Sequence, residues 1–101
     1  MGSKPLGLRV LNEIYSLSPE TLIGVLTIND TNDTRNVFTG FQSFSNNNAV
    51  DLHVANNRKQ SEQIVDKLKP DLCLVVNWYW IISDTLLYIV PYGFIGIHNS
   101  L

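Results

Sequence analysis

The sequence has 101 residues, of which 45% are apolar and 16% are charged, so it encodes one small globular domain, residues 1–101, rather than a disordered chain. Its net charge of −2 and its seven scattered Lys and Arg residues exclude a dedicated nucleic-acid surface, because phosphate binding requires clustered basic side chains. A single cysteine, Cys73, excludes an intrachain disulfide and is interpreted as a small buried apolar residue.

The apolar residues change period repeatedly along the chain, between the repeat of a helix and the continuous runs of buried strands. Pro5 fits the first turn of a helix, and Ser83 is a candidate N-cap for a later one. Polar runs over 29–33, 45–48 and 56–59 are interpreted as loops. In chain order, the predicted elements are a helix over 5–17, a strand over 22–27, a helix over 37–44, a strand over 50–54, a helix over 60–68, a strand over 72–76, a helix over 84–90 and a strand over 94–98.

Strands that alternate with helices predict parallel pairing with right-handed crossovers. The expected fold is therefore α/β, with a Rossmann-like, mostly parallel sheet and helices on both faces. Residues 2–7 look like the turn that follows a first strand, yet only Met1 precedes them. We therefore expect an incomplete sheet that lacks its first strand and its later strands, and a chain that is unstable alone or pairs its strands differently.

Three segments resemble the formyltetrahydrofolate-dependent formyltransferase family. Residues 2–8 (GSKPLGL) resemble the family's first loop, and residues 96–101 (GIHNSL) are similar to the start of its N-I-H-x-S-L-L-P motif. Residues 70–83 (PDLCLVVNWYWIIS) look like its strand and loop of the type PDL-hydrophobic-Y-x-x-I-I-P, and the spacing between the last two segments also matches. The resemblance covers nearly all of the chain but only the first half of the family's catalytic domain.

The resemblance implies transfer of a formyl group from N10-formyltetrahydrofolate, the formyl donor, to a small-molecule amine in the intact protein. These 101 residues alone are expected to be inactive. Family acceptors include glycinamide ribonucleotide, methionyl-tRNA and nucleotide-linked amino sugars, and residues 77–82 look closer to the sugar-nucleotide branch than to the purine branch. Of the family's catalytic Asn, His and Asp, His98 matches the histidine, Gly96 occupies the Asn position, and the Asp would lie beyond Leu101. The residues that correspond to the family's pterin-contacting loop are Trp78, Tyr79, Trp80, Ile81 and Ile82.

The chemistry explains why a histidine is wanted at this place. An amine that attacks a formyl carbon produces a tetrahedral oxyanion, which preorganised hydrogen-bond donors stabilise. A histidine can donate to that oxygen and carry the proton, so His98 is the catalytic candidate. Strand alternation puts residues 96 and 98 on one face, so Asn99 replaces the missing amide only if the chain bends after His98.

Four residues are secondary candidates for binding the acceptor. Gly2 and Ser3 precede a helix whose first N–H groups can hold a phosphate, although a simple turn explains the same loop. Asn99 and Ser100 follow the candidate histidine in the motif. No metal site is predicted, because the two histidines are far apart in the sequence.

Structural alternatives exist for the main candidates. His98 can be a strand-end histidine satisfied by a neighbour, and Trp78, Tyr79 and Trp80 can be ordinary core or lid residues. His53 has no motif around it and is interpreted as a structural or a surface residue. A non-catalytic nucleotide- or folate-binding module, and a gene fragment without function, are therefore kept as alternatives to the enzyme.

The expected location is cytoplasmic. Residues 1–5 lack the apolar core of a leader peptide. The apolar stretch over 78–97 is interrupted by Ser83, Asp84, Pro91 and Gly93, so no membrane-spanning segment is predicted. Nothing in the sequence selects an oligomeric state.

Overall fold

Helices and strands alternate along the chain, as the sequence predicts. The computed structural model describes residues 1–29 and 37–97. Of the described helices, the longest has 14 residues, and none combines the length and apolar character needed to cross a membrane. The elements in chain order are α1 (Lys4–Leu17), the 3-10 helix η1 (Pro19–Thr21), β1 (Val25–Thr27), α2 (Phe38–Asn48), β2 (Leu52–Val54), α3 (Arg58–Leu68), β3 (Cys73–Val76), α4 (Asp84–Ile89) and β4 (Phe94–Ile97).

The four strands form two parallel two-stranded sheets. In the first sheet β1 pairs with β2, with Val25 opposite Leu52. In the second sheet β3 pairs with β4, with Cys73 opposite Phe94. Each pair of strands is connected through a helix, so the predicted parallel pairing is confirmed in both sheets.

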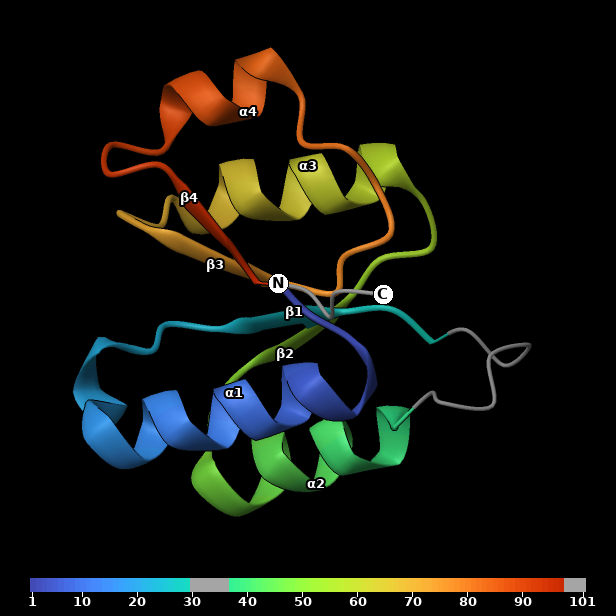
Figure 1. The fold of residues 1–101 in the computed structure, drawn as a ribbon, viewed down its shortest axis with the longest axis vertical. Coiled ribbons are helices and arrows are strands. Elements are labelled where there is room, and N and C mark those ends of the chain that lie inside the picture. The colour runs from blue at the N-terminus through green and yellow to red at the C-terminus, as the bar shows by residue number, and fades with distance from the viewer. Residues whose placement is uncertain (30–36, 98–101) are drawn as a thin grey trace.

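The backbone of residues 1–2 lies between the two sheets and bonds to both (Figure 1). The Gly2 N–H donates to the Leu26 carbonyl at 2.9 Å, and the Val76 N–H donates to the Met1 carbonyl at 2.8 Å. Met1 also donates through its ammonium to the Leu74 carbonyl at 2.8 Å, and Gly2 forms a parallel bridge with Val76. The order across the molecule is therefore β2, β1, residues 1–2, β3 and β4.

Helices cover both faces of the strands, α1 and α2 on one side and α3 and α4 on the other (Figure 1). Neighbouring residues of β1 reach opposite cores: Val25 packs with the α1–α2 side and Leu26 with the α3–α4 side. This alternation is the normal geometry of a strand covered on both faces. The buried residues of the α1–α2 core are Leu11, Val25, Phe41, Phe44 and Val50. Those of the α3–α4 core are Leu26, Ile28, Ala55, Val65, Cys73, Leu86 and Val90.

One predicted loop is wrong, because α2 continues through 45–48 to Asn48. The Asn48 Nδ2 donates to the Phe44 carbonyl at 2.9 Å, so this amide bonds to the backbone of its own helix. The helix ends only at Ala49, whose φ of 54° is left-handed and closes the last turn.

Two helix starts show why capping residues predict boundaries. α3 begins two residues earlier than predicted, because Asn57 caps it: the Asn57 Oδ1 accepts the Gln60 N–H at 2.8 Å. The Ser83 cap of α4 is confirmed, since its hydroxyl accepts the Leu86 N–H at 3.2 Å. The last described strand, β4, ends at Ile97.

Candidate functional site

A pocket of about 420 Å³ lies where β3 and β4 end. Its walls come from Lys4 at the start of α1, from Val75 and residues 77–80 around the end of β3, and from Gly96 and Ile97 of β4. Ligands of open parallel sheets bind at the carboxyl ends of the strands. We call this cavity the strand-end pocket.

The start of α1 is tied to the loop after β3. Ser3 is 3% exposed, and its hydroxyl donates to the Asn77 carbonyl at 2.6 Å. The Ser3 N–H donates to the Val76 carbonyl at 3.1 Å. Because the hydroxyl is used in this way, it does not cap α1. These bonds hold one wall of the strand-end pocket against the other.

Two residues of the pocket have backbone angles in the left-handed region. Lys4 has φ 63° and Asn77 has φ 50°. For residues other than glycine this conformation costs on the order of 1–3 kcal/mol, less for asparagine, and it is concentrated at functional sites. Among the described non-glycine residues, Ala49 and Lys69 also have left-handed φ, and each closes the end of a helix, an ordinary structural role.

The side chains of residues 78–82 alternate in direction. Trp78, Trp80 and Ile82 pack against the α3–α4 core, whereas Tyr79 is 37% exposed and Ile81 is 82% exposed. The two tryptophan rings meet edge to face, with centroids 5.5 Å apart. Trp78, Tyr79 and Trp80 line the strand-end pocket, and Ile81 and Ile82 are not among its lining residues. The two tryptophans therefore belong both to the core and to the pocket wall.

Two lining residues of the pocket carry polar groups: Lys4 has a positive charge, and Trp78 has a ring N–H without a described partner. The Lys4 Nζ lies 5.1 Å from the centroid of the Tyr79 ring, a cation–π distance. The Nε1 of Trp78 is buried, and no described residue accepts its hydrogen bond. A buried donor left unpaired costs about 1–3 kcal/mol.

Gly96 leaves open space at the position where the resembled family has an asparagine. A Cβ atom built on Gly96 would meet no described atom within 4 Å, and its φ is not left-handed. The candidates His98, Asn99 and Ser100 lie outside the described residues. Ile97, the residue before His98, lines the pocket.

The remaining predicted residues lie elsewhere. Gly2 is not among the residues that line the strand-end pocket, and a Cβ atom built on it would be 3.3 Å from the Val76 carbonyl oxygen. His53 lies on β2, and no described residue pairs with its buried Nε2, which would be 3.6 Å from a Cβ atom built on Gly24. Within residues 1–29 and 37–97, no cluster of three or more His, Cys, Asp or Glu side chains is placed to hold a metal ion.

Sequence reasoning missed Lys4 as a pocket residue. The only signal for it is a basic residue at a helix start, where acidic residues are favoured. No protein-family model matches this chain, and no curated protein matches its sequence. The family resemblance thus depends on the three segments quoted above.

Proposed function

We propose that the protein transfers a formyl group from N10-formyltetrahydrofolate to an amine, with a nucleotide-linked amino sugar as the favoured acceptor. One observation carries the proposal. The strand-end pocket is lined by Lys4, residues 77–80 and residues 96–97, one group from each of the three segments that resemble the family. These segments are far apart in the sequence, so their meeting at one cavity is not a consequence of local structure.

A Rossmann-like arrangement is the second part of this proposal. From residues 1–2 the chain runs outward to β1 and β2, then returns to β3 and β4 on the other side. This reversal places a topological switch point beside residues 1–2, and ligands of doubly wound sheets bind outside the strand ends at such a point. The strand-end pocket lies beside that point, at the ends of β3 and β4.

The residues present fit part of a folate. The pterin ring is flat and carries nitrogen and oxygen acceptors, and the lining of the strand-end pocket includes the aromatic residues Trp78, Tyr79 and Trp80. Lys4 supplies positive charge for a carboxylate of the donor or a phosphate of the acceptor. Contact through ring edges and backbone is favoured over stacking, because Trp78 and Trp80 pack against the core.

His98 is the proposed catalytic residue. In the sequence it directly follows Ile97, which lines the strand-end pocket. There it would donate to the oxyanion and take the proton from the attacking amine. No aspartate of this sequence matches the family's catalytic Asp, so we expect these residues alone to bind the donor and to transfer the formyl group at most very slowly.

Donor binding is tested by calorimetry with tetrahydrofolate and its N10-formyl derivative. We expect Lys4→Met to weaken binding about tenfold, equivalent to about 1.4 kcal/mol. The matched control is Lys59→Met, which removes an exposed lysine on α3 and should leave the affinity unchanged. Absence of binding by either folate contradicts the proposal.

Transfer is tested by tetrahydrofolate release with a panel of amines, including a uridine-diphosphate amino sugar. His98→Ala should abolish release, whereas His53→Ala should retain it in the folded fraction. Donor binding with no release, or with release that His98→Ala leaves unchanged, would instead support the non-catalytic folate-binding module.

A further inference from the structure

The hydroxyl of Ser3 is not used in the way that is usual at the start of a helix. Ser3 is the N-cap of α1, yet its side chain makes no bond to that helix. The N-cap residues of α3 and α4, Asn57 and Ser83, each accept an N–H of their own first turn. Ser3 is 3% exposed and instead donates its hydroxyl to the Asn77 carbonyl at 2.6 Å. A bond that would stabilise α1 is therefore replaced by a contact with a segment 74 residues away.

Asn77 connects this contact to the last described strand. Its N–H donates to the Ile97 carbonyl at 3.0 Å, while its own carbonyl accepts the Ser3 hydroxyl. The Ser3 N–H also donates to the Val76 carbonyl at 3.1 Å. The peptide groups on either side of Asn77 thus join the start of α1, the end of β3 and the end of β4. We call the bonds among Ser3, Asn77 and Ile97 the three-segment link.

The link depends on a backbone conformation that most residues avoid. Asn77 has φ 50°, in the left-handed region, whereas an extended residue would continue β3. Asparagine tolerates this region better than most residues, but the conformation still costs free energy. The Ser3 hydroxyl bonds to the carbonyl of this same residue, so it stabilises the turn by which the chain leaves β3.

The link also joins the walls of the strand-end pocket. Asn77 and Ile97 both line the pocket. Lys4, which directly follows Ser3, lines it as well. Between the start of α1 and the loop after β3, the Lys4 Nζ lies 5.1 Å from the centroid of the Tyr79 ring. A cation–π contact that is open to solvent is weak, so it does not fix these two walls without the buried hydroxyl bond.

We propose that Ser3 is a positioning residue of the strand-end pocket, which acts on a ligand through Asn77. Ser3 is not among the residues that line the pocket, so its effect has to pass through the three-segment link. Without the hydroxyl, the left-handed turn at Asn77 loses a bond that favours it. Ligand binding would then have to order the walls, at a cost in affinity. The proposal rests on the proposed function only in the choice of probe, a folate.

The test compares Ser3→Ala with Ser61→Ala, a closely matched control. Ser61 is 2% exposed, and its hydroxyl donates to the Arg58 carbonyl at 2.6 Å within α3. Each variant loses one buried hydroxyl-to-carbonyl bond, so we expect similar falls in unfolding free energy in urea titrations. Only Ser3→Ala should weaken the binding of tetrahydrofolate measured by calorimetry, by about fivefold. Equal affinity of the two variants for tetrahydrofolate would overturn the proposal.

An NMR measurement separates positioning from a general loss of stability. The ε-methylene of Lys4 carries the Nζ that lies over the Tyr79 ring, so the ring current shifts its proton resonance. Ser3→Ala should move this resonance toward its value in the urea-unfolded chain, whereas Ser61→Ala should leave it in place. An unmoved Lys4 resonance in Ser3→Ala would refute the positioning role, whether or not the chain binds a folate.

A further measurement needs no variant, so it still decides the matter if Ser3→Ala does not fold. Adding tetrahydrofolate should slow hydrogen exchange of the Asn77 N–H about tenfold, because the ligand and the link favour the same arrangement of the walls. The Leu86 N–H, which Ser83 accepts at the start of α4, should slow by less. Equal slowing at both positions would contradict the proposal.

The two proposals fail in different ways. Absence of folate binding by the unmodified chain contradicts the proposed function, and the Lys4 resonance then decides the role of Ser3. A Ser3→Ala variant that binds tetrahydrofolate as tightly as the unmodified chain contradicts only the role of Ser3.

Discussion

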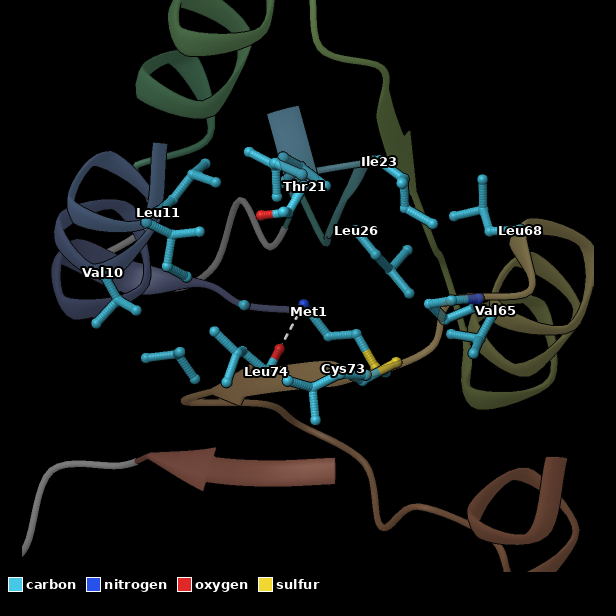
Figure 2. A pocket seen from close by; sticks show the side chains of 18 of the residues that line it. Met1, Val10, Leu11, Thr21, Ile23, Leu26, Val65, Leu68, Cys73 and Leu74 are labelled. Atoms are coloured by element: carbon cyan, nitrogen blue, oxygen red, sulfur yellow. Dashed lines mark hydrogen bonds between the residues drawn. The ribbon is translucent and has the colours of Figure 1, made fainter. Parts of the chain in front are cut away.

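The amino group of Met1 makes the stability of this protein depend on pH in a way that acetylation should remove. The ammonium donates to the Leu74 carbonyl at 2.8 Å, in a cavity of about 550 Å³ between the two sheets (Figure 2). Burial lowers its pKa from 8.0 to about 6, and the nearby Cys73 opposes this shift only in part. Burial also raises the pKa of the Cys73 thiol.

The direction in which stability changes with pH follows from how many protons the folded and the unfolded chain bind. Above pH 8 the amine is neutral in both the folded and the unfolded chain, so it contributes no pH dependence. As the pH falls from 8 to 6, the unfolded chain binds a proton that the folded chain does not, and stability is lost. Below pH 6 both are charged and the loss is complete. With a folded pKa of about 6 against 8.0, the loss is about 3 kcal/mol.

Acetylating the Met1 amino group removes this titration while keeping one N–H for the Leu74 carbonyl. The acetyl carbonyl also provides an acceptor for the Leu26 N–H, which adds about 1 kcal/mol at any pH. We therefore expect the acetylated chain to exceed the free-amine chain in unfolding free energy by about 4 kcal/mol at pH 5 and by about 1 kcal/mol at pH 9.

Urea denaturation followed by circular dichroism measures both chains at both pH values. The two proteins are made by chemical synthesis, so that the lysines stay unmodified and Met1 is retained. All other titrating groups are common to both chains and cancel in the comparison. If the unfolding free energies of the two chains change by the same amount between pH 5 and pH 9, the buried amine does not titrate as argued.

Three further substitutions follow from the structure. Gly96→Asn places an amide in the open space at the strand-end pocket and should raise the rate of formyl transfer by about 10²-fold. An unchanged rate with intact donor binding would refute the assignment of position 96 to the family's asparagine. Asn57→Ala removes the cap of α3 and should lower the unfolding free energy by about 1 kcal/mol in urea titrations, whereas the exposed Ser16→Ala control should change it by less than about 0.5 kcal/mol. Phe41→Ala truncates a side chain that is 2% exposed and should lower the unfolding free energy by about 3–5 kcal/mol in the same assay. The control is Tyr88→Ala, at a residue 90% exposed, and an equal loss in both variants would contradict the packing of the α1–α2 core.

Local patterns predicted the elements well where neighbouring residues decide them. Ser83 caps α4 as predicted, because a hydroxyl bonds to an N–H three residues on, within the same turn. The loop predicted over 45–48 failed because Phe41 and Phe44 bury one face of α2, which holds the asparagine run in the helix.

The candidate site was predicted only in part. Motif reasoning selected Trp78, Tyr79 and Trp80, which line the strand-end pocket, and left open whether they also pack in the core, as the two tryptophans do. That packing depends on the α3–α4 core, which forms from residues distant in the sequence. Lys4 was missed for the same reason, since only its position over the Tyr79 ring makes it part of the pocket.

By itself, the sequence determined the alternation of helices and strands, the parallel pairing and the residues that carry the family resemblance, because periodicity, capping and motifs depend on residues near in the chain. The tertiary structure alone decided that residues 1–2 bond to both sheets and that a cavity lies beside them. Those contacts join backbone groups of Met1, Leu26 and Leu74. Backbone groups are the same for nearly every residue type, so no side-chain pattern marks which of them meet.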